Sequence, residues 1–163
     1  MSKISLTHIG RAEMVDLPGI GALSVPAKVD TGADLCAVWA HETNEDDKGL
    51  DCVFFGPESE YYDGAVHHFS KKDYTITRIA NSFGEHELRY KIKLRIRVKG
   101  RLISGTFTLS DRSKKLYPIL IGRRLLKDKF VVDVSDGQAL HDEENRRSKI
   151  LKDELSKLQK GAK

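Results

Sequence analysis

The chain carries the segment Ala27-Lys28-Val29-Asp30-Thr31-Gly32-Ala33, in which a short apolar strand runs into a tight turn with a carboxylate. Gly32 has no side chain, so a backbone amide can approach the Asp30 oxygens. By itself, Asp-Thr-Gly also fits a solvated acid in an ordinary β-turn. A second apolar run, Leu120-Ile121-Gly122-Arg123, follows much later and again meets a glycine. The two segments together make Asp30 a candidate for chemistry.

The region between these segments has the pattern of antiparallel strands. Tyr74 to Ile79 and Glu87 to Tyr90 flank turn residues at 81–84 and predict a projecting hairpin. From Lys91 to Lys99, apolar and basic residues alternate strictly, which predicts a strand with one packed and one solvated face.

Flanking patterns extend this β-rich assignment. Met14 to Leu17 and Ala22 to Val29 predict two strands joined by a turn. Leu102 to Leu109 predicts a strand in which Gly105 is a possible bulge. The residues between the Asp30 turn and Tyr74 predict an irregular acidic loop.

The C-terminal part contains a short buried strand over Pro118–Gly122, one or two helical turns over Arg123–Lys129, and a closing strand over Phe130–Val134. From His141 onward the sequence predicts a polar helix. Its narrow apolar stripe consists of Leu151, Leu155 and Leu158. We expect this stripe to dock on the body of the protein or on a partner chain.

The ordered set of motifs resembles the retropepsin-type aspartic peptidases, in which an Asp-Thr-Gly turn is flanked by a strand that ends in apolar-Gly-Arg. More narrowly, the chain is similar to the bacterial retropepsin-like family associated with RimK-type ATP-grasp glutamate ligases, often labelled "ATP-dependent zinc protease". The matching segments are Ile9–Arg11, Val15–Pro18, Ala27–Ala33, Asn81–Gly84, Thr108–Ser113 and Pro118–Arg123. The expected fold is an all-β, retropepsin-like (acid protease) barrel protomer with one short helix and a C-terminal helical tail. We place the peptidase domain at residues 1–138 and the tail at residues 139–163.

Amide hydrolysis by carboxylates needs two of them sharing one proton, so that one deprotonates water while the other polarises the carbonyl. The chain has a single Asp-Thr-Gly, so we expect a twofold homodimer that brings Asp30 of each chain to the axis. The resemblance implies that Asp30, Thr31 and Gly32 form the catalytic turn and that the Thr31 hydroxyls lock the two turns together. It also implies a flap that excludes water. The flap candidates are Asn81, Ser82, Phe83 and Gly84.

Four residues are expected to support this turn. Both loops should meet beneath the site, so we expect Asp34 to pair with Arg123. Ala33 and Gly122 complete the supporting set. Asp111 is the runner-up carboxylate if the active unit is a monomer, although its plainer interpretation is an acid in a turn.

We expect neither a metal ion nor a cofactor. A metallopeptidase of the usual kind needs two histidines one helical turn apart with a glutamate between them, and this pattern is missing. His67 and His68 are adjacent, which on a strand directs them to opposite faces. The sequence also lacks a glycine-rich phosphate loop, so any link to ATP would belong to the associated ligase.

Composition favours one soluble, cytoplasmic domain. The chain has 163 residues and a formal net charge of +4. Cys36 and Cys52 are too few for a disulfide scaffold and fit reduced thiols used in packing. No stretch is long and apolar enough to span a bilayer, and the first residues lack a signal core. We therefore expect no membrane partner.

Charge is unevenly distributed, with acids concentrated from Glu42 to Asp63 and bases from Glu85 to Arg101. The basic face of residues 91–99 is best explained as a solvated outer face that discourages edge pairing. Alternatively, these cations, with Arg123 or Arg124, attract an acidic polymer such as a glutamate-rich peptide tail, which the ligase association also suggests. Nucleic acid ranks low, because aromatic residues are 7% of the chain and none interleaves the basic strand.

The sequence thus predicts a homodimeric aspartic endopeptidase that hydrolyses acidic or glutamate-rich peptides. The main alternative is a catalytically inactive peptide-binding module of the same fold, because one chain cannot show whether two Asp30 side chains meet. A zinc-dependent peptidase ranks lower.

Overall fold

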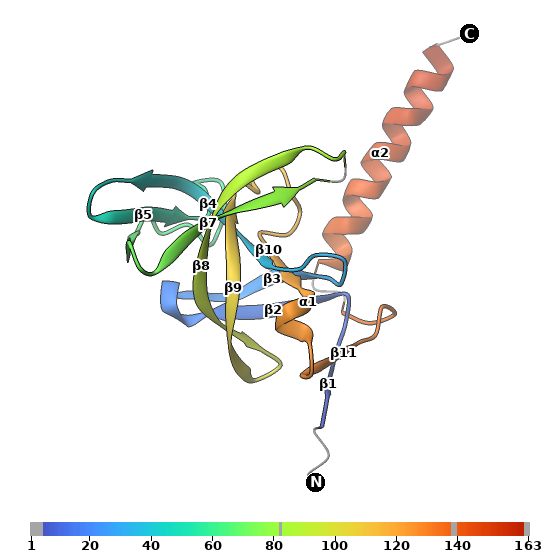
Figure 1. Ribbon diagram of the computed structural model, residues 1–163. Helices are drawn as coiled ribbons and strands as arrows, with labels where there is room; N and C mark the ends of the chain where they lie inside the picture. Colours follow the sequence, from blue (N-terminus) through green and yellow to red (C-terminus); the bar gives the residue numbers. More distant parts are fainter. Residues whose placement is uncertain (1–4, 82, 138–139, 162–163) are drawn as a thin grey trace.

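The computed structural model describes residues 5–81, 83–137 and 140–161. Six strands form a near-ring in the order β10-β3-β2-β8-β9-β4, because β10 also pairs with β4 (Figure 1). These strands are β2 (Ala12–Leu17), β3 (Ala22–Asp30), β4 (Cys36–Glu45), β8 (His86–Val98), β9 (Arg101–Ser110) and β10 (Ile119–Gly122). The predicted all-β barrel is confirmed.

The remaining elements extend this barrel. Strands β5 (Gly49–Phe54) and β6 (Val66–Ser70) continue the sheet beyond β4, and β7 (Tyr74–Ala80) forms a hairpin with the first half of β8. Strand β1 (Thr7–Ile9) pairs in parallel with β11 (Phe130–Val132) in a separate two-stranded sheet. The helical elements are the 3-10 turn η1 (Pro18–Ile20), the short helix α1 (Arg123–Leu126) and the C-terminal helix α2 (His141–Gly161).

Alternation along β8 builds much of the core. Ile92, Leu94, Ile96 and Val98 are buried, whereas the basic residues between them, such as Arg95, are exposed. The strand then reverses through Lys99-Gly100, both with positive φ, and pairs with β9 in continuous register. Two residues of positive φ match the right-handed twist of a tight hairpin. The predicted hairpin over 74–90 and the solvated basic face are both confirmed.

The prediction of an irregular acidic loop between the Asp30 turn and Tyr74 is wrong. Most of this region is strands β4, β5 and β6. Residues Cys36 to Ala40 are buried consecutively, so they lack the period-two alternation by which a one-sided strand is recognised. The acidic residues lie further along, on the exposed end of β4 and in the turns that follow.

Gly105 is not a bulge, because the pairing of β8 with β9 runs past it without a shift. Its role is to leave space for helix α1. A Cβ at this position would lie 2.6 Å from Leu125 Cδ1, closer than carbon atoms can approach. The glycine therefore lets α1 pack directly on the barrel.

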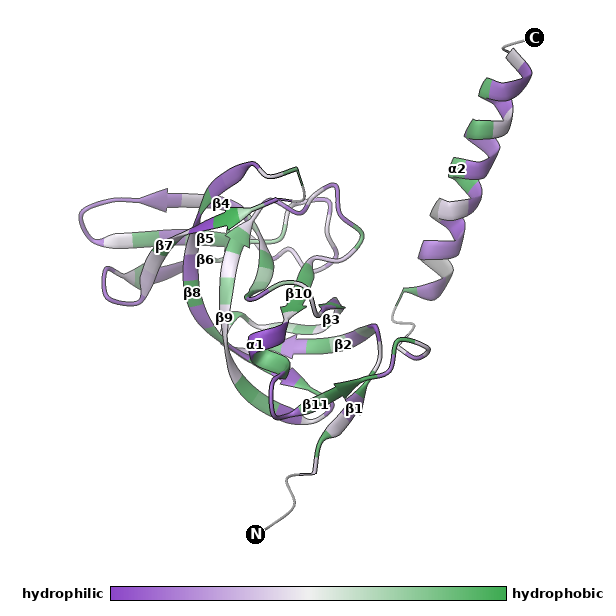
Figure 2. Cartoon of the chain, turned by 45° about the vertical axis from the view of Figure 1, so that its right-hand side comes forward, coloured by the Kyte–Doolittle hydropathy of each residue, from purple (hydrophilic) through white to green (hydrophobic). Residues whose placement is uncertain are grey.

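Helix α2 is joined to the barrel at its first turn. Glu144 accepts a hydrogen bond from the Tyr117 hydroxyl at 2.6 Å and forms an ion pair with Arg11 at 2.8 Å. Beyond this turn the helix runs away from the barrel with alternating polar and apolar residues (Figure 2). The leucines of its apolar stripe are exposed, at 59% for Leu151, 57% for Leu155 and 73% for Leu158. The prediction that this stripe docks on the barrel is therefore wrong for the single chain. The domain boundary at 138/139 stays a prediction.

None of the helices in the described part of the chain combines the length and apolar character needed to cross a membrane.

Replacing Ile96, which is fully buried at the centre of β8, tests the core. Ile96→Ala should lower the free energy of unfolding by about 2 to 5 kcal/mol, through lost burial and the cavity left behind. The matched substitution Ile76→Ala, on a side chain 55% exposed in β7, should change it by about 0.5 kcal/mol or less. Urea denaturation measures both, and equal effects would contradict this account of the core.

Candidate active site

The Asp30 turn is shaped by the strand that lies beneath it. Strand β10 pairs in parallel with β3 and antiparallel with β4, so it lies between the two strands that the turn connects. Asp30 is the last residue of β3, and its partner in register is Gly122, the last residue of β10. The turn from Asp30 to Leu35 must therefore pass over the end of β10.

Backbone contacts fix this crossing. The Arg123 amide donates to the Ala33 carbonyl at 2.8 Å, and the Gly122 amide donates to Cys36 Sγ at 3.4 Å. A Cβ on Gly122 would lie 2.3 Å from the Leu35 carbonyl oxygen, so only glycine permits the approach. Gly122 and Ala33 thus have clear structural reasons to support the turn.

The carboxylate of Asp30 is oriented by its own turn. Its Oδ1 accepts hydrogen bonds from the backbone amides of Gly32 at 3.1 Å and Ala33 at 3.2 Å. Asp30 is half-buried, whereas Thr31 beside it is exposed. One carboxylate oxygen is therefore held by the chain, and the neighbouring Thr31 is accessible from outside.

The expected contact between Asp34 and Arg123 is present. Arg123 Nε donates to Asp34 Oδ1 at 2.6 Å, and Arg124, which the sequence did not single out as a partner of Asp34, donates to the other oxygen at 2.9 Å. The hydrogen bond from Arg123 is the main cause that lowers the pKa of the Asp34 carboxyl. This cluster joins α1 to the Asp30 turn on the exposed side of the crossing.

A cavity of about 470 Å³ lies between the Asp30 turn and the β7–β8 hairpin. The turn contributes residues 32–35, the hairpin contributes residues 77–80 on β7 together with Arg89 and Lys91 on β8, and Arg124 closes one side. Figure 1 shows the hairpin projecting on the same side of the barrel as the turn between β3 and β4. The hairpin and the Asp30 turn therefore line the same cavity.

The hairpin tip is organised around Asn81. Its Oδ1 accepts hydrogen bonds from the amides of Phe83 and Glu85, both at 2.9 Å, and Gly84 has a positive φ. Phe83 is 88% exposed. Ser82, the remaining flap candidate, lies outside the described residues.

Two arginines near Asp30 were not recognised from the sequence. Arg89 lines the cavity with its side chain 21% exposed, and its buried Nε has no hydrogen-bond partner among the residues that the structure describes. Arg112 is 9% exposed and donates from Nε to the Tyr117 carbonyl at 2.8 Å. Arg112 lies within the matched motif Thr108–Ser113, but no sequence pattern indicates that a cation there is buried.

The other titratable candidates do not gather at this site. Asp111 is exposed, and its Oδ1 accepts the Ser113 amide at 2.9 Å, as expected for an acid in a turn. His68 Nδ1 lies 2.7 Å from Asp51 Oδ1, and the His67 ring packs against Phe54. Within the described ranges, His, Cys, Asp and Glu side chains form no group of three or more able to hold a metal ion.

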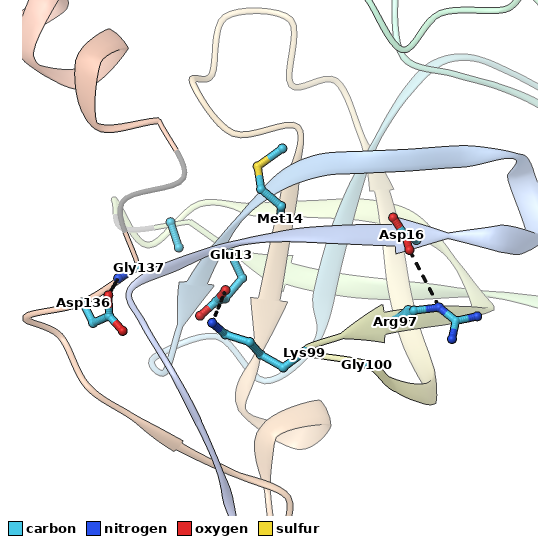
Figure 3. Close-up of a pocket in the computed structure, with 9 residues that line it drawn as sticks. Glu13, Met14, Asp16, Arg97, Lys99, Gly100, Asp136 and Gly137 are labelled. Carbon is cyan, nitrogen blue, oxygen red and sulfur yellow. Dashed lines mark hydrogen bonds and ion pairs between the residues drawn. The ribbon is translucent and has the colours of Figure 1, made fainter.

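A second cavity, of about 480 Å³, shares no residue with the Asp30 turn. Four of its charged residues form two ion pairs: Lys99 Nζ lies 3.4 Å from Glu13 Oε2, and Arg97 Nε lies 3.7 Å from Asp16 Oδ2 (Figure 3). Glu13 also accepts the Gly10 amide at 2.8 Å. These pairs join β2 to the end of β8, and the remaining acid, Asp136, accepts the Gly137 amide at 2.7 Å.

The family model described as retropepsin-like aspartic endopeptidase RimB matches residues 8–143. The chain belongs to this RimB-like family. The matched range includes the Asp30 turn, the β7–β8 hairpin, the crossing at Gly122 and the first turn of α2.

Two individual proteins are also similar to the chain. A probable alpha-L-glutamate ligase of Desulfotalea psychrophila is 25% identical over 135 residues, which cover 77% of this chain. The match covers 27% of that protein's length, so the chain spans about a quarter of it. A crystal structure of Lpg0085, a DUF785 protein of unknown function from Legionella pneumophila, superposes with a TM-score of 0.61 at 23% identity. The superposition covers 82% of this chain and 97% of Lpg0085, which shows that the two proteins share a fold.

The Asp34 cluster predicts a pH dependence of stability. Because the folded-state pKa of Asp34 is lowered, its contribution is complete above the ordinary aspartate value of about 3.9 and is lost as the pH falls through the lower folded value. Asp34→Asn should therefore reduce the urea midpoint at pH 7, and the difference from wild type should shrink below about pH 4. Asp47→Asn, in the exposed turn after β4, is the control. A difference that did not change with pH would contradict the assignment.

Proposed function

We propose that the protein is a homodimeric aspartic endopeptidase in which Asp30 from each of two chains forms a dyad that shares one proton. The observation that carries this proposal is the Asp30 carboxylate itself. It is held by amides of its own turn, on a crossing fixed by Gly122. The residues that follow it in this turn line a cavity that the projecting β7–β8 hairpin also lines. Membership of the RimB-like family supports the same reaction class.

In this reaction, the ionised carboxylate takes a proton from water while the protonated one donates to the carbonyl oxygen of the scissile amide. The water oxygen adds to the carbonyl carbon and forms a tetrahedral diol. The diol then collapses as the carbon–nitrogen bond breaks: the amine nitrogen takes the proton held by the first Asp30, and a diol hydroxyl gives its proton to the second Asp30 as the new carbonyl forms. The dyad then again holds one shared proton. The amides of Gly32 and Ala33 keep Asp30 in position throughout.

Dimerisation is required because each chain supplies one Asp-Thr-Gly turn. The exposure of Thr31 supports this arrangement, because its hydroxyl is free to meet the same residue of a second chain across a twofold axis. In the proposed dimer, the hairpin around Asn81 closes as a flap and excludes water from the reacting amide.

We propose acidic or glutamate-rich peptides as substrates. The cavity is lined by more cations than anions, and its one acid, Asp34, is already paired with Arg123 and Arg124. The cavity's cations are Arg78, Arg89, Lys91 and Arg124. A positive cavity attracts and retains acidic chains. The relative named as a probable alpha-L-glutamate ligase also supports a place in the pathway of an ATP-grasp ligase.

We further propose a cytoplasmic location. Cys36 and Cys52 are both buried and unpaired, as is usual for proteins of reducing compartments.

Asp30→Asn should lower kcat/KM on a glutamyl peptide about 10³-fold, because an amide can neither accept nor donate the shared proton. Asp111→Asn should retain activity, since Asp111 is bound within its own turn. Peptide cleavage followed by mass spectrometry measures both variants. Equal turnover by wild type and Asp30→Asn would contradict the proposal, and so would activity that disappears on chelation and returns with zinc.

Dilution tests the dimer. If two chains build one site, specific activity should fall as the protein is diluted below its dimer dissociation constant. Sedimentation at the same concentrations should show conversion to single chains. Adding excess Asp30→Asn to wild type should also reduce activity, because mixed dimers carry one functional carboxylate. Full activity of a sedimenting monomer would exclude the shared dyad.

A further inference from the structure

A glutamate side chain is already bound to the arginine that faces the cavity. Arg89 Nη2 lies 2.9 Å from Glu87 Oε2. The two residues are two positions apart on β8 and therefore share a face of the strand. The hydrogen bond from Arg89 lowers the pKa of the Glu87 carboxyl. The free protein thus shows how this guanidinium holds a glutamyl carboxylate.

The partners differ in how firmly they are placed. The Glu87 side chain is 60% exposed, whereas that of Arg89 is 21% exposed. Glu87 can therefore turn into solvent at little cost, while Arg89 stays beside the cavity. The guanidinium also keeps a donor that Glu87 does not use, because its Nε has no partner within the described part of the chain.

A second buried cation increases the positive charge at this position. Burial, and then the charge of Arg89, lower the pKa of Arg112 to about 10, while the charge of Asp30 acts in the opposite direction. Arg112 therefore remains charged at neutral pH. Its hydrogen bond is to a backbone carbonyl, and among the described residues no carboxylate forms an ion pair with it. Arg89 is thus paired with Glu87, whereas Arg112 has the charge of Asp30 nearby but no carboxylate at ion-pair distance among the described residues.

On the basis of the proposed function, we propose that Arg89 binds the carboxylate of an acidic substrate residue next to the scissile bond. In the free protein, Glu87 binds the Arg89 guanidinium until this substrate carboxylate displaces it. Arg112 is a positioning residue that adds positive charge from behind. Among the other cations of the cavity, Arg124 is bound to Asp34 in the fixed crossing, so a substrate carboxylate gains less from it.

Two peptides that differ only in glutamate or glutamine on either side of the cleaved bond test this proposal. Wild type should favour the glutamyl peptide in kcat/KM by about 10- to 100-fold, as expected for hydrogen bonds to a charged group. Arg89→Gln should bring this ratio close to one, because it lowers kcat/KM for the glutamyl peptide far more than for the glutaminyl peptide. Arg95→Gln removes the same charge from an exposed position of the same strand and should preserve the ratio.

Removing the Glu87 carboxylate, which competes with the substrate for Arg89, should strengthen substrate binding. Glu87→Gln should lower KM for the glutamyl peptide several-fold, because the substrate no longer displaces a bound carboxylate. In an Arg89→Gln background the same substitution should have no effect, since its influence passes through Arg89.

The outcomes separate this inference from the proposed function. Turnover of both peptides at equal rates, abolished by Asp30→Asn, would overturn the role of Arg89 and leave the peptidase assignment intact. Loss of both activities in a folded Arg89→Gln protein would show a structural role and also overturn it. If neither peptide were cleaved, the peptidase assignment would fail, and calorimetric binding would decide the inference. Tighter binding of the glutamyl peptide that depends on Arg89 would support it, and equal binding would overturn it.

Discussion

Strand β10 lies between β3 and β4, and the turn that joins those two strands has to cross its end at backbone distance. This constraint explains why Gly122 has no side chain and why the amides after it bond to carbonyls of the turn. Asp30 is in register with Gly122, so the same crossing fixes the carboxylate. A functional group placed on closely packed backbone has little freedom to move, which is what general acid–base chemistry requires.

Charge around the crossing is arranged in two layers. On the exposed side, Asp34 binds two arginines of α1 and fastens that helix to the turn. On the inner side, Arg89 and Arg112 are largely removed from solvent, and the charge of Asp30 acts to raise the pKa of Arg112. In the outer layer all three side chains are joined by hydrogen bonds, whereas in the inner layer Arg112 has no carboxylate at ion-pair distance among the described residues. Arginine therefore joins α1 to the turn on one side and, in our proposal, recognises the substrate on the other.

Elements with a local signature were predictable from the sequence. The alternation of β8, the turn chemistry before and after it, and the apolar-Gly-Arg segment each depend on residues close together in the chain. Strand β4 was missed because it is buried on both faces along Cys36–Ala40, so its pattern carries no period. The contact of Asp34 with Arg123 was predictable because both loops were expected to meet beneath the site. The burial of Arg112 was not, because it depends on the packing of the segment after β9, where Arg112 donates to the Tyr117 carbonyl. Whether two turns meet is a property of two molecules, and one chain does not determine it.

The sulfur beneath the crossing has a consequence of its own. Cys36 accepts the Gly122 amide, and burial raises its pKa to about 11, while burial raises that of Cys52 to about 12. A buried, protonated thiol is a poor nucleophile. Alkylating reagents and mild oxidants will therefore leave the intact fold unmodified, and the slow rate at which they do label Cys36 will report how often the barrel opens.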